Sequence, residues 1–162
     1  MKWINLISLS IFVWLLQLLL SDSFSINTVR PDFCVILILY WSLIYGRTFG
    51  ICSGFLFGLV LDLSSSSIFF GMSPITYTIS GYLGGVLYKN RARLNPFYFS
   101  LSWVAILLFH FFVYCSIQYQ DLWEINRQIF WGKWLGTSIY TISFVAVLQF
   151  VYPLNKIDNV KS

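Results

Sequence analysis

Residues 50–70, GICSGFLFGLVLDLSSSSIFF, decide the fold of this chain. Gly50, Gly54 and Gly58 recur every fourth residue among large apolar side chains. Asp62 keeps the same spacing, and at 3.6 residues per turn all four positions share one helical face. Lipid tails are as apolar as leucine, so membrane helices associate through close packing at small residues. The stretch therefore predicts a membrane helix with a glycine groove that another helix backbone can enter.

The composition places the whole chain in a lipid bilayer. Hydrophobic residues make up 58% of its 162 residues and charged residues only 10%, against about 25% charged residues in a soluble domain. Nearly all of the sequence lies in apolar runs, which leaves no stretch as long as a separate water-soluble domain. We therefore expect an all-α membrane protein with one polytopic domain over residues 1–162.

Hydropathy windows of about nineteen residues locate six expected membrane spans. They cover residues 3–20, 32–45, 48–63, 68–88, 97–117 and 130–152. A cleaved secretory signal is the alternative for the first run, because Lys2 precedes it. The run is longer than the roughly 7–15 residues of a signal core, and no A-x-A motif follows it, so we expect an uncleaved span.

The basic residues orient these spans. With a cytoplasmic amino terminus, the inner side holds Lys2, Arg47, Lys89, Arg91, Arg93, Lys156 and Lys161, and the outer side holds Arg30, Arg127 and Lys133. The positive-inside rule then places both termini in the cytoplasm. The cluster of Lys89, Arg91 and Arg93 is interpreted as an anchor against anionic lipid, with a dock for a cytoplasmic protein as the alternative. This placement explains the net charge of +4 without nucleic-acid binding.

Two glycines of the fourth span make it the natural partner of the groove. Gly81 and Gly85 repeat the four-residue spacing. Packing of the groove within the chain is the favoured interpretation. Contact with another protein is the alternative, and the sequence leaves a homo-oligomer open.

The motif Arg30-Pro31-Asp32 opens the second span. Pro31 suits the first helical position and Asp32 suits the positive end of the helix dipole. Asp62 lies at the negative end of its own helix, where a carboxylate is disfavoured. A hairpin folded about residues 46–47 brings Asp62 level with Pro31, so we hypothesise a bidentate Arg30–Asp62 contact at the outer membrane edge. A solvated interfacial carboxylate is the alternative.

Catalysis is the function class that the sequence supports least. An intramembrane enzyme needs paired ionisable groups in a water-accessible pocket, whereas the acidic residues here lie at span ends or in loops. His110 has no HxxxH or HExxH neighbour, so we predict a neutral ring bonded to a neighbouring hydroxyl. Cys34, Cys52 and Cys115 lie in apolar runs without CxxC spacing. We therefore predict no catalytic residue, no metal site and no cofactor.

Short motifs within residues 30–85 carry a family resemblance. They are Arg30-Pro31-Asp32-Phe33, Leu39-Tyr40-Trp41, Gly54-Phe55, Gly58-Leu59, Asp62-Leu63, Gly71 and Tyr82-Leu83. In these motifs, and in its length and the order of its spans, the chain resembles the MreD family of bacterial rod shape-determining proteins.

The resemblance implies a non-enzymatic scaffold of the cell-wall elongation machinery in the bacterial inner (cytoplasmic) membrane, which maintains rod shape. The partner it implies is MreC, a periplasmic protein with a single membrane helix. The wider assembly implied by the family includes the MreB filament, a polytopic glycosyltransferase and a penicillin-binding transpeptidase.

The same family is similar in fold to the substrate-binding subunits of vitamin-uptake transporters, which supplies an alternative function. Its candidate pocket residues are the polar side chains of the fourth span, namely Thr76, Tyr77, Thr78, Ser80 and Tyr82. Hydroxyls in membrane helices also bond back to carbonyls of their own helix, which is the competing interpretation.

The longest outer loop, residues 118–128, is acidic and contains Asp121, Trp123 and Glu124. An ordinary solvated loop explains it. The alternative is a contact with a periplasmic partner in which Trp123 is the anchor.

Overall fold

The computed structural model describes residues 2–23, 30–64, 70–90 and 94–151, and all regular secondary structure within these ranges is helical. Its helices are α1 (Lys2–Ser23), α2 (Phe33–Tyr45), α3 (Arg47–Ser64), α4 (Met72–Asn90), α5 (Pro96–Gln118), α6 (Gln120–Ile125) and α7 (Arg127–Val151). A long helix lies over most of each of the six ranges expected from hydropathy, although α4 begins only at Met72 and residue 152 lies outside the described residues. The expected start of the fourth range, at residue 68, lies outside the described residues.

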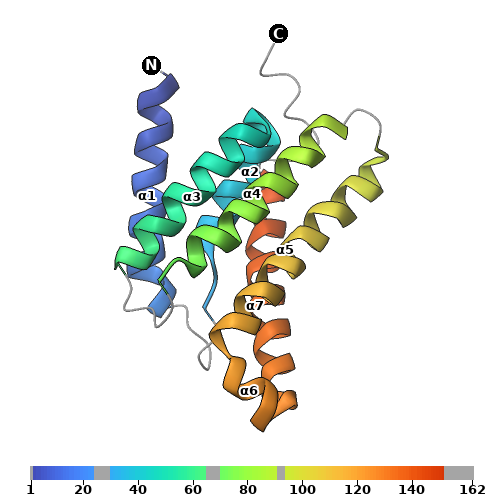
Figure 1. The fold of residues 1–162 in the computed structure, drawn as a ribbon. Helices are drawn as coiled ribbons and strands as arrows, with labels where there is room; N and C mark the ends of the chain where they lie inside the picture. The colour runs from blue at the N-terminus through green and yellow to red at the C-terminus, as the bar shows by residue number, and fades with distance from the viewer. Residues whose placement is uncertain (1, 24–29, 65–69, 91–93, 152–162) are drawn as a thin grey trace.

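The long helices run in alternating directions (Figure 1). The first turn of α1, the α2–α3 turn, the last turn of α4 and the last turn of α7 lie at one end of the molecule. The short helix α6 lies at the opposite end, where α5, α6 and α7 extend beyond the other helices. The sequence interpretation was wrong here, since it treated residues 118–128 as a loop.

The second helix is fixed by a side chain at its start and by a glycine at its end. The Asp32 side chain accepts a hydrogen bond from the Val35 amide at 3.0 Å, which makes Asp32 the N-cap of α2. Pro31 precedes this cap, so its expected place as the first helical residue is wrong. Gly46 ends α2 with φ of 90° and donates to the Ser42 carbonyl at 3.0 Å. Because α3 begins at the next residue, the expected tight turn at 46–47 is confirmed.

The centre of the molecule is α2, which is buried along most of its length. It contacts α1, α3, α4 and α7, and α1 packs chiefly on α2. The most extensive helix–helix contact is between α3 and α4, and α5 packs on α4 and α7. This order of packing brings the ends of α2, α4, α5 and α7 into reach of one another.

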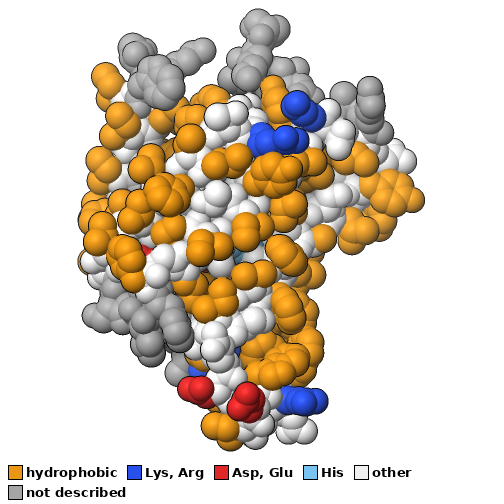
Figure 2. Space-filling view, in the orientation of Figure 1, with side chains coloured by type: hydrophobic (Ala, Val, Ile, Leu, Met, Phe, Trp, Pro, Cys, Tyr) orange, Lys and Arg blue, Asp and Glu red, His pale blue; other side chains and the backbone are white. Residues whose placement is uncertain are grey.

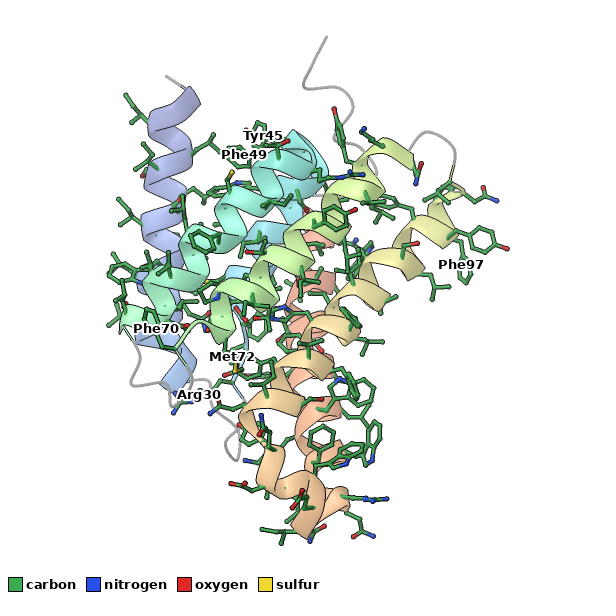
Figure 3. The ribbon with its side chains drawn as sticks, in the orientation of Figure 1. Arg30, Tyr45, Phe49, Phe70, Met72 and Phe97 are labelled. Carbon is green, nitrogen blue, oxygen red and sulfur yellow. The ribbon has the colours of Figure 1, made fainter. Side chains whose placement is uncertain are left out.

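The outer surface is that of a membrane protein. Figure 2 shows apolar side chains over the flanks of the helices and charged side chains at the two ends. Within the described residues, α3 and α5 are long and apolar enough to cross a membrane, and 6–19 and 33–45 are shorter apolar helical segments. In Figure 3, Tyr45 and Phe49 lie near the α2–α3 turn, and Phe70 lies beside the opposite end of α3.

Candidate functional site

The five glycines expected to form a groove all lie at the α3–α4 contact. A Cβ added to Gly50 would collide with the Gly81 carbonyl oxygen, and one added to Gly81 would collide with the Gly50 carbonyl oxygen. Gly85 faces the backbone of Arg47 in the same way. The two helix backbones therefore touch in the half of this pair nearer the α2–α3 turn, so these glycines pack against backbone of the same chain.

The other half of the contact, nearer the start of α4, uses the remaining two glycines. A Cβ on Gly54 would lie 2.5 Å from the Tyr77 carbonyl oxygen, and one on Gly58 would collide with the backbone of Pro74. In both places the obstacle is backbone, which cannot rotate away as a side chain can. Only glycine therefore fits these two positions.

Sequence reasoning missed one further glycine. Gly84 faces the hydroxyl of Ser42, a fully buried residue of α2, and Ser42 donates to the Leu39 carbonyl at 2.8 Å. A Cβ on Gly50 would also meet Ser42. The glycine face of α4 therefore seats against two helices, and the adjacent pair Gly84-Gly85 was the signal that could have revealed it.

Asp62 caps the turn between α3 and α4 and does not face water. It is only 4% exposed, so a solvated carboxylate is wrong. The Gly71 amide donates to its Oδ2 at 2.6 Å, and Gly71 has φ of 96°, which glycine adopts without a steric penalty. Its Oδ1 has no hydrogen-bond partner in the described part of the chain. The hypothesised bidentate contact with Arg30 is wrong, because it needs both oxygens.

Arg30 influences the pKa of a different residue, Tyr119. Burial raises the pKa of Tyr119, the Cys115 thiol adds to the increase, and the Arg30 guanidinium opposes it. Arg30 therefore lies within electrostatic reach of the start of α6. Figure 3 shows it beside the last turn of α1.

Asp32 is the centre of a polar cluster that joins four helices, here called the Asp32 node (Asp32, Tyr77, Ser80, His110 and Thr141). The Tyr77 hydroxyl of α4 donates to Asp32 Oδ2 at 2.6 Å. The Asp32 amide donates to Thr141 Oγ1 of α7 at 3.3 Å. Nε2 of His110 in α5 lies 3.8 Å from the same Oδ2. One carboxylate and its amide thus link α2 to three other helices.

His110 lies deep in this node and is 1% exposed. Its Nδ1 lies 2.8 Å from the Ser80 hydroxyl, so the predicted contact with a neighbouring hydroxyl is confirmed. The ring stacks on Tyr77 with centroids 5.2 Å apart and planes at 6°. Ser80 also lies 2.9 Å from the Thr76 carbonyl oxygen, and its single proton serves only one of these acceptors. When the Ser80 hydroxyl donates to the Thr76 carbonyl, Nδ1 of His110 must carry the proton that it shares with Ser80. A second proton, on Nε2, would then face Asp32.

The first helix contacts the residues on either side of Asp32 through Gln17. Gln17 accepts from the Phe33 amide at 2.7 Å and donates to the Pro31 carbonyl at 3.3 Å. This side-chain amide therefore holds the residues on both sides of Asp32. Sequence reasoning identified Asp32 and His110 separately, and it did not find Gln17, Thr141 or the connection between them.

The other expected site residues lie at the two ends of the molecule. Lys89 is exposed in the last turn of α4, while Arg91 and Arg93 lie outside the described residues. Trp123 of α6 packs against Phe130 with ring centroids 4.9 Å apart and remains 40% exposed. Among the described residues, no group of three His, Cys, Asp or Glu side chains is placed to hold a metal ion.

Comparison with known proteins identifies the family. The family model of the rod shape-determining protein MreD matches residues 1–156 of this chain. The chain belongs to the MreD family. Proteins of the MreD family are membrane proteins of the cell-shape machinery, so this chain has a role in rod shape determination. No curated protein and no solved structure gives a significant match.

The MreD motifs coincide with the structural contacts. In the motif Arg30-Pro31-Asp32-Phe33, Asp32 is the centre of the node, and the Pro31 carbonyl and the Phe33 amide bond to Gln17. Asp62 accepts from the Gly71 amide just before α4. Gly54 and Gly58 lie at the close contact with α4. In this member of the MreD family the motif residues thus hold helices against one another.

Proposed function

We propose that this MreD-family chain is a non-enzymatic scaffold of the cell-wall elongation machinery in the bacterial inner membrane. It crosses the membrane six times as one polytopic domain, with both termini in the cytoplasm. It binds MreC and links it to the MreB filament, the elongation glycosyltransferase and the penicillin-binding transpeptidase.

The observation that carries this proposal is that the buried ionisable groups contact other parts of the bundle. Asp32, Asp62 and His110 each contact a neighbouring helix or turn. Groups that a catalyst would present to a substrate are thus used to fix the packing of helices. A rigid bundle whose flanks are apolar supports recognition by partner helices within the lipid.

The alternating helices support the proposed orientation. Lys89 and Arg47 lie at the end of the molecule where α1 starts and α7 finishes, and Arg127 lies at the opposite end (Figure 1). The positive-inside rule assigns the first of these ends to the cytoplasm.

The fourth helix gives the uptake alternative no support. The hydroxyls of Thr76, Thr78 and Ser80 donate to carbonyls of their own helix at the fourth residue back, at 3.1, 2.5 and 2.9 Å. Thr76 and Ser80 are also fully packed, at 2% and 1% exposure. These side chains are satisfied within the bundle, so we do not retain vitamin uptake as a candidate.

Depletion tests the proposed function. A rod-shaped host that carries this chain as its only MreD-family protein should become round when expression stops, and tagged chain should recover MreC from detergent extracts. Gly58→Leu should fail to restore rods and MreC recovery, because the added side chain separates α3 from α4. Gly132→Leu is the matched control, since a Cβ at Gly132 meets no atom within 4 Å.

Two results would contradict the scaffold role. One is a depleted host that stays rod-shaped and shows a growth defect that an added vitamin rescues. The other is a Gly58→Leu variant that still supports rods and recovers MreC, which would remove the glycine contact from the proposed function.

A further inference from the structure

A pocket of about 380 Å³ lies where α5 meets α6, at the end of the molecule that extends beyond the other helices (Figure 1). It is lined by Phe112, Ser116, Gln120, Trp123 and Glu124. None of these residues belongs to the Asp32 node or to the glycine contact. The pocket therefore has no part in the helix packing described above.

The lining changes from apolar to charged along the chain. Phe112 and Ser116 are one helical turn apart on α5, about 6 Å along the axis, and Gln120 and Glu124 follow on α6. Phe112 is 36% exposed at one end of this series, and Trp123 is 40% exposed towards the other end. An amphipathic molecule fits such a gradient, with its apolar part at Phe112 and its polar part at Glu124.

Charge decides which polar group fits. Glu124 makes no ion pair within the described part of the chain, and two basic residues close to it in the chain, Arg127 and Lys133, lie over rings instead. The Arg127 guanidinium lies 5.8 Å from the Trp123 ring centroid, and Lys133 Nζ lies 4.2 Å from that of Tyr119. A carboxylate beside an exposed indole is the combination that binds ammonium groups, through charge and through the ring face.

We propose that this pocket binds the ammonium headgroup of an aminophospholipid, with Glu124 and Trp123 around the ammonium and Ser116 and Gln120 beside the polar linkage. An anionic headgroup is disfavoured, because the charged residue of the lining, Glu124, is acidic. The proposal needs only the membrane placement of the chain and is independent of its scaffold role.

Native mass spectrometry tests the site with phosphatidylethanolamine and phosphatidylglycerol as probes. The full-length chain is kept in tetraethylene glycol monooctyl ether, which carries neither sugar nor ammonium, and the two lipids are added in equal amounts. We expect the chain to retain phosphatidylethanolamine about tenfold over phosphatidylglycerol. Glu124→Gln and Trp123→Ala should each abolish this preference.

Two matched variants separate the pocket from general surface effects. Asp121→Asn removes an acidic group of the same short helix that does not line the pocket, and Tyr98→Ala removes an exposed ring of α5 outside it. Both should keep the preference, with helicity by circular dichroism confirming the fold of all four variants. The proposal fails if both lipids are retained equally or if Asp121→Asn acts like Glu124→Gln. It also fails if maltotetraose, a sugar without an ammonium group, displaces the lipid.

Discussion

Asp32 makes three hydrogen bonds to other residues, two through its side chain and one through its backbone amide. Its carboxylate caps α2 and accepts the Tyr77 hydroxyl, and its amide donates to Thr141. A buried hydrogen bond contributes little net stability when formed, but leaving one partner unsatisfied costs about 1–3 kcal/mol. In the low dielectric of the bundle, removal of the Asp32 side chain would leave both the Val35 amide and the Tyr77 hydroxyl without an acceptor.

A double-mutant cycle measures the central contact of the node. Asp32→Asn removes the charge, and Tyr77→Phe removes the hydroxyl while keeping the ring on His110. We expect each change to lower the free energy of unfolding by about 1–3 kcal/mol. The double variant should lose about 1 kcal/mol less than the sum of the two single losses, because both changes remove the same contact. Unfolding in mixed micelles, followed by circular dichroism, gives these values.

Tyr98→Phe is the control for the tyrosine change, since Tyr98 lies on α5 and is 58% exposed. It should leave stability within about 0.5 kcal/mol of the parent. Strict additivity of Asp32→Asn and Tyr77→Phe would show that the two groups do not interact in the membrane-like environment.

At the scale of the element, α3 and α4 form a single unit because no side chain separates their backbones. Asp62 and Gly71 close the end of this unit, and the one-residue turn at Gly46 joins it to α2. Helices in such contact have little freedom to slide, since all five groove glycines face backbone atoms of the other helix. We expect α3 and α4 to move as one body in any rearrangement of the bundle.

Alanine substitutions test this contact with opposite signs. Gly58→Ala places a methyl group against the backbone of Pro74, so we expect a loss of at least about 2 kcal/mol in the free energy of unfolding. Gly132→Ala adds a methyl group in open space within α7 and should stabilise by about 0.5–1 kcal/mol, because alanine favours the helix. Thermal unfolding in detergent distinguishes the two, and equal midpoints would disprove the close contact.

The same elements show how far the sequence predicts this fold. The glycine contact was predictable because its signal is local, with one residue every four on each of two helices. The Asp32 node was not, because Tyr77 and Thr141 lie 45 and 109 residues from Asp32. No spacing rule connects positions so far apart. The short helix α6 was missed because six residues are too few to show a helical period.

Asp62 shows a different limit. Its position at the end of a helix correctly indicated a need for compensation, but a charged side chain was expected to provide it. A backbone amide provides it instead. Every residue carries such a donor, so the sequence does not mark which one will be used.

At the scale of the whole molecule, the proposed orientation predicts which ends are accessible from each side of the membrane. Asn90 and Asn126 are both exposed asparagines, one at the end of α4 and one between α6 and α7. In a variant with Cys34, Cys52 and Cys115 replaced by alanine, Asn126→Cys should react with a membrane-impermeant maleimide in intact spheroplasts. Asn90→Cys should react only after permeabilisation.

Each outcome of this labelling has a defined meaning. Reaction of Asn90→Cys alone in intact spheroplasts would invert the proposed orientation. Reaction of both residues from the outer side would contradict the odd number of crossings that separates them, which here is α5 alone.

The reach of the Asp32 node has a consequence for biogenesis. Residues from α2, α4 and α5 leave the ribosome well before Thr141, which belongs to the last helix. A nascent chain arrested before α7 therefore keeps an Asp32 amide without its acceptor at membrane depth. Truncated products differ from finished ones in this buried donor, which gives membrane proteases and chaperones a chemical distinction between an incomplete chain and a mature one.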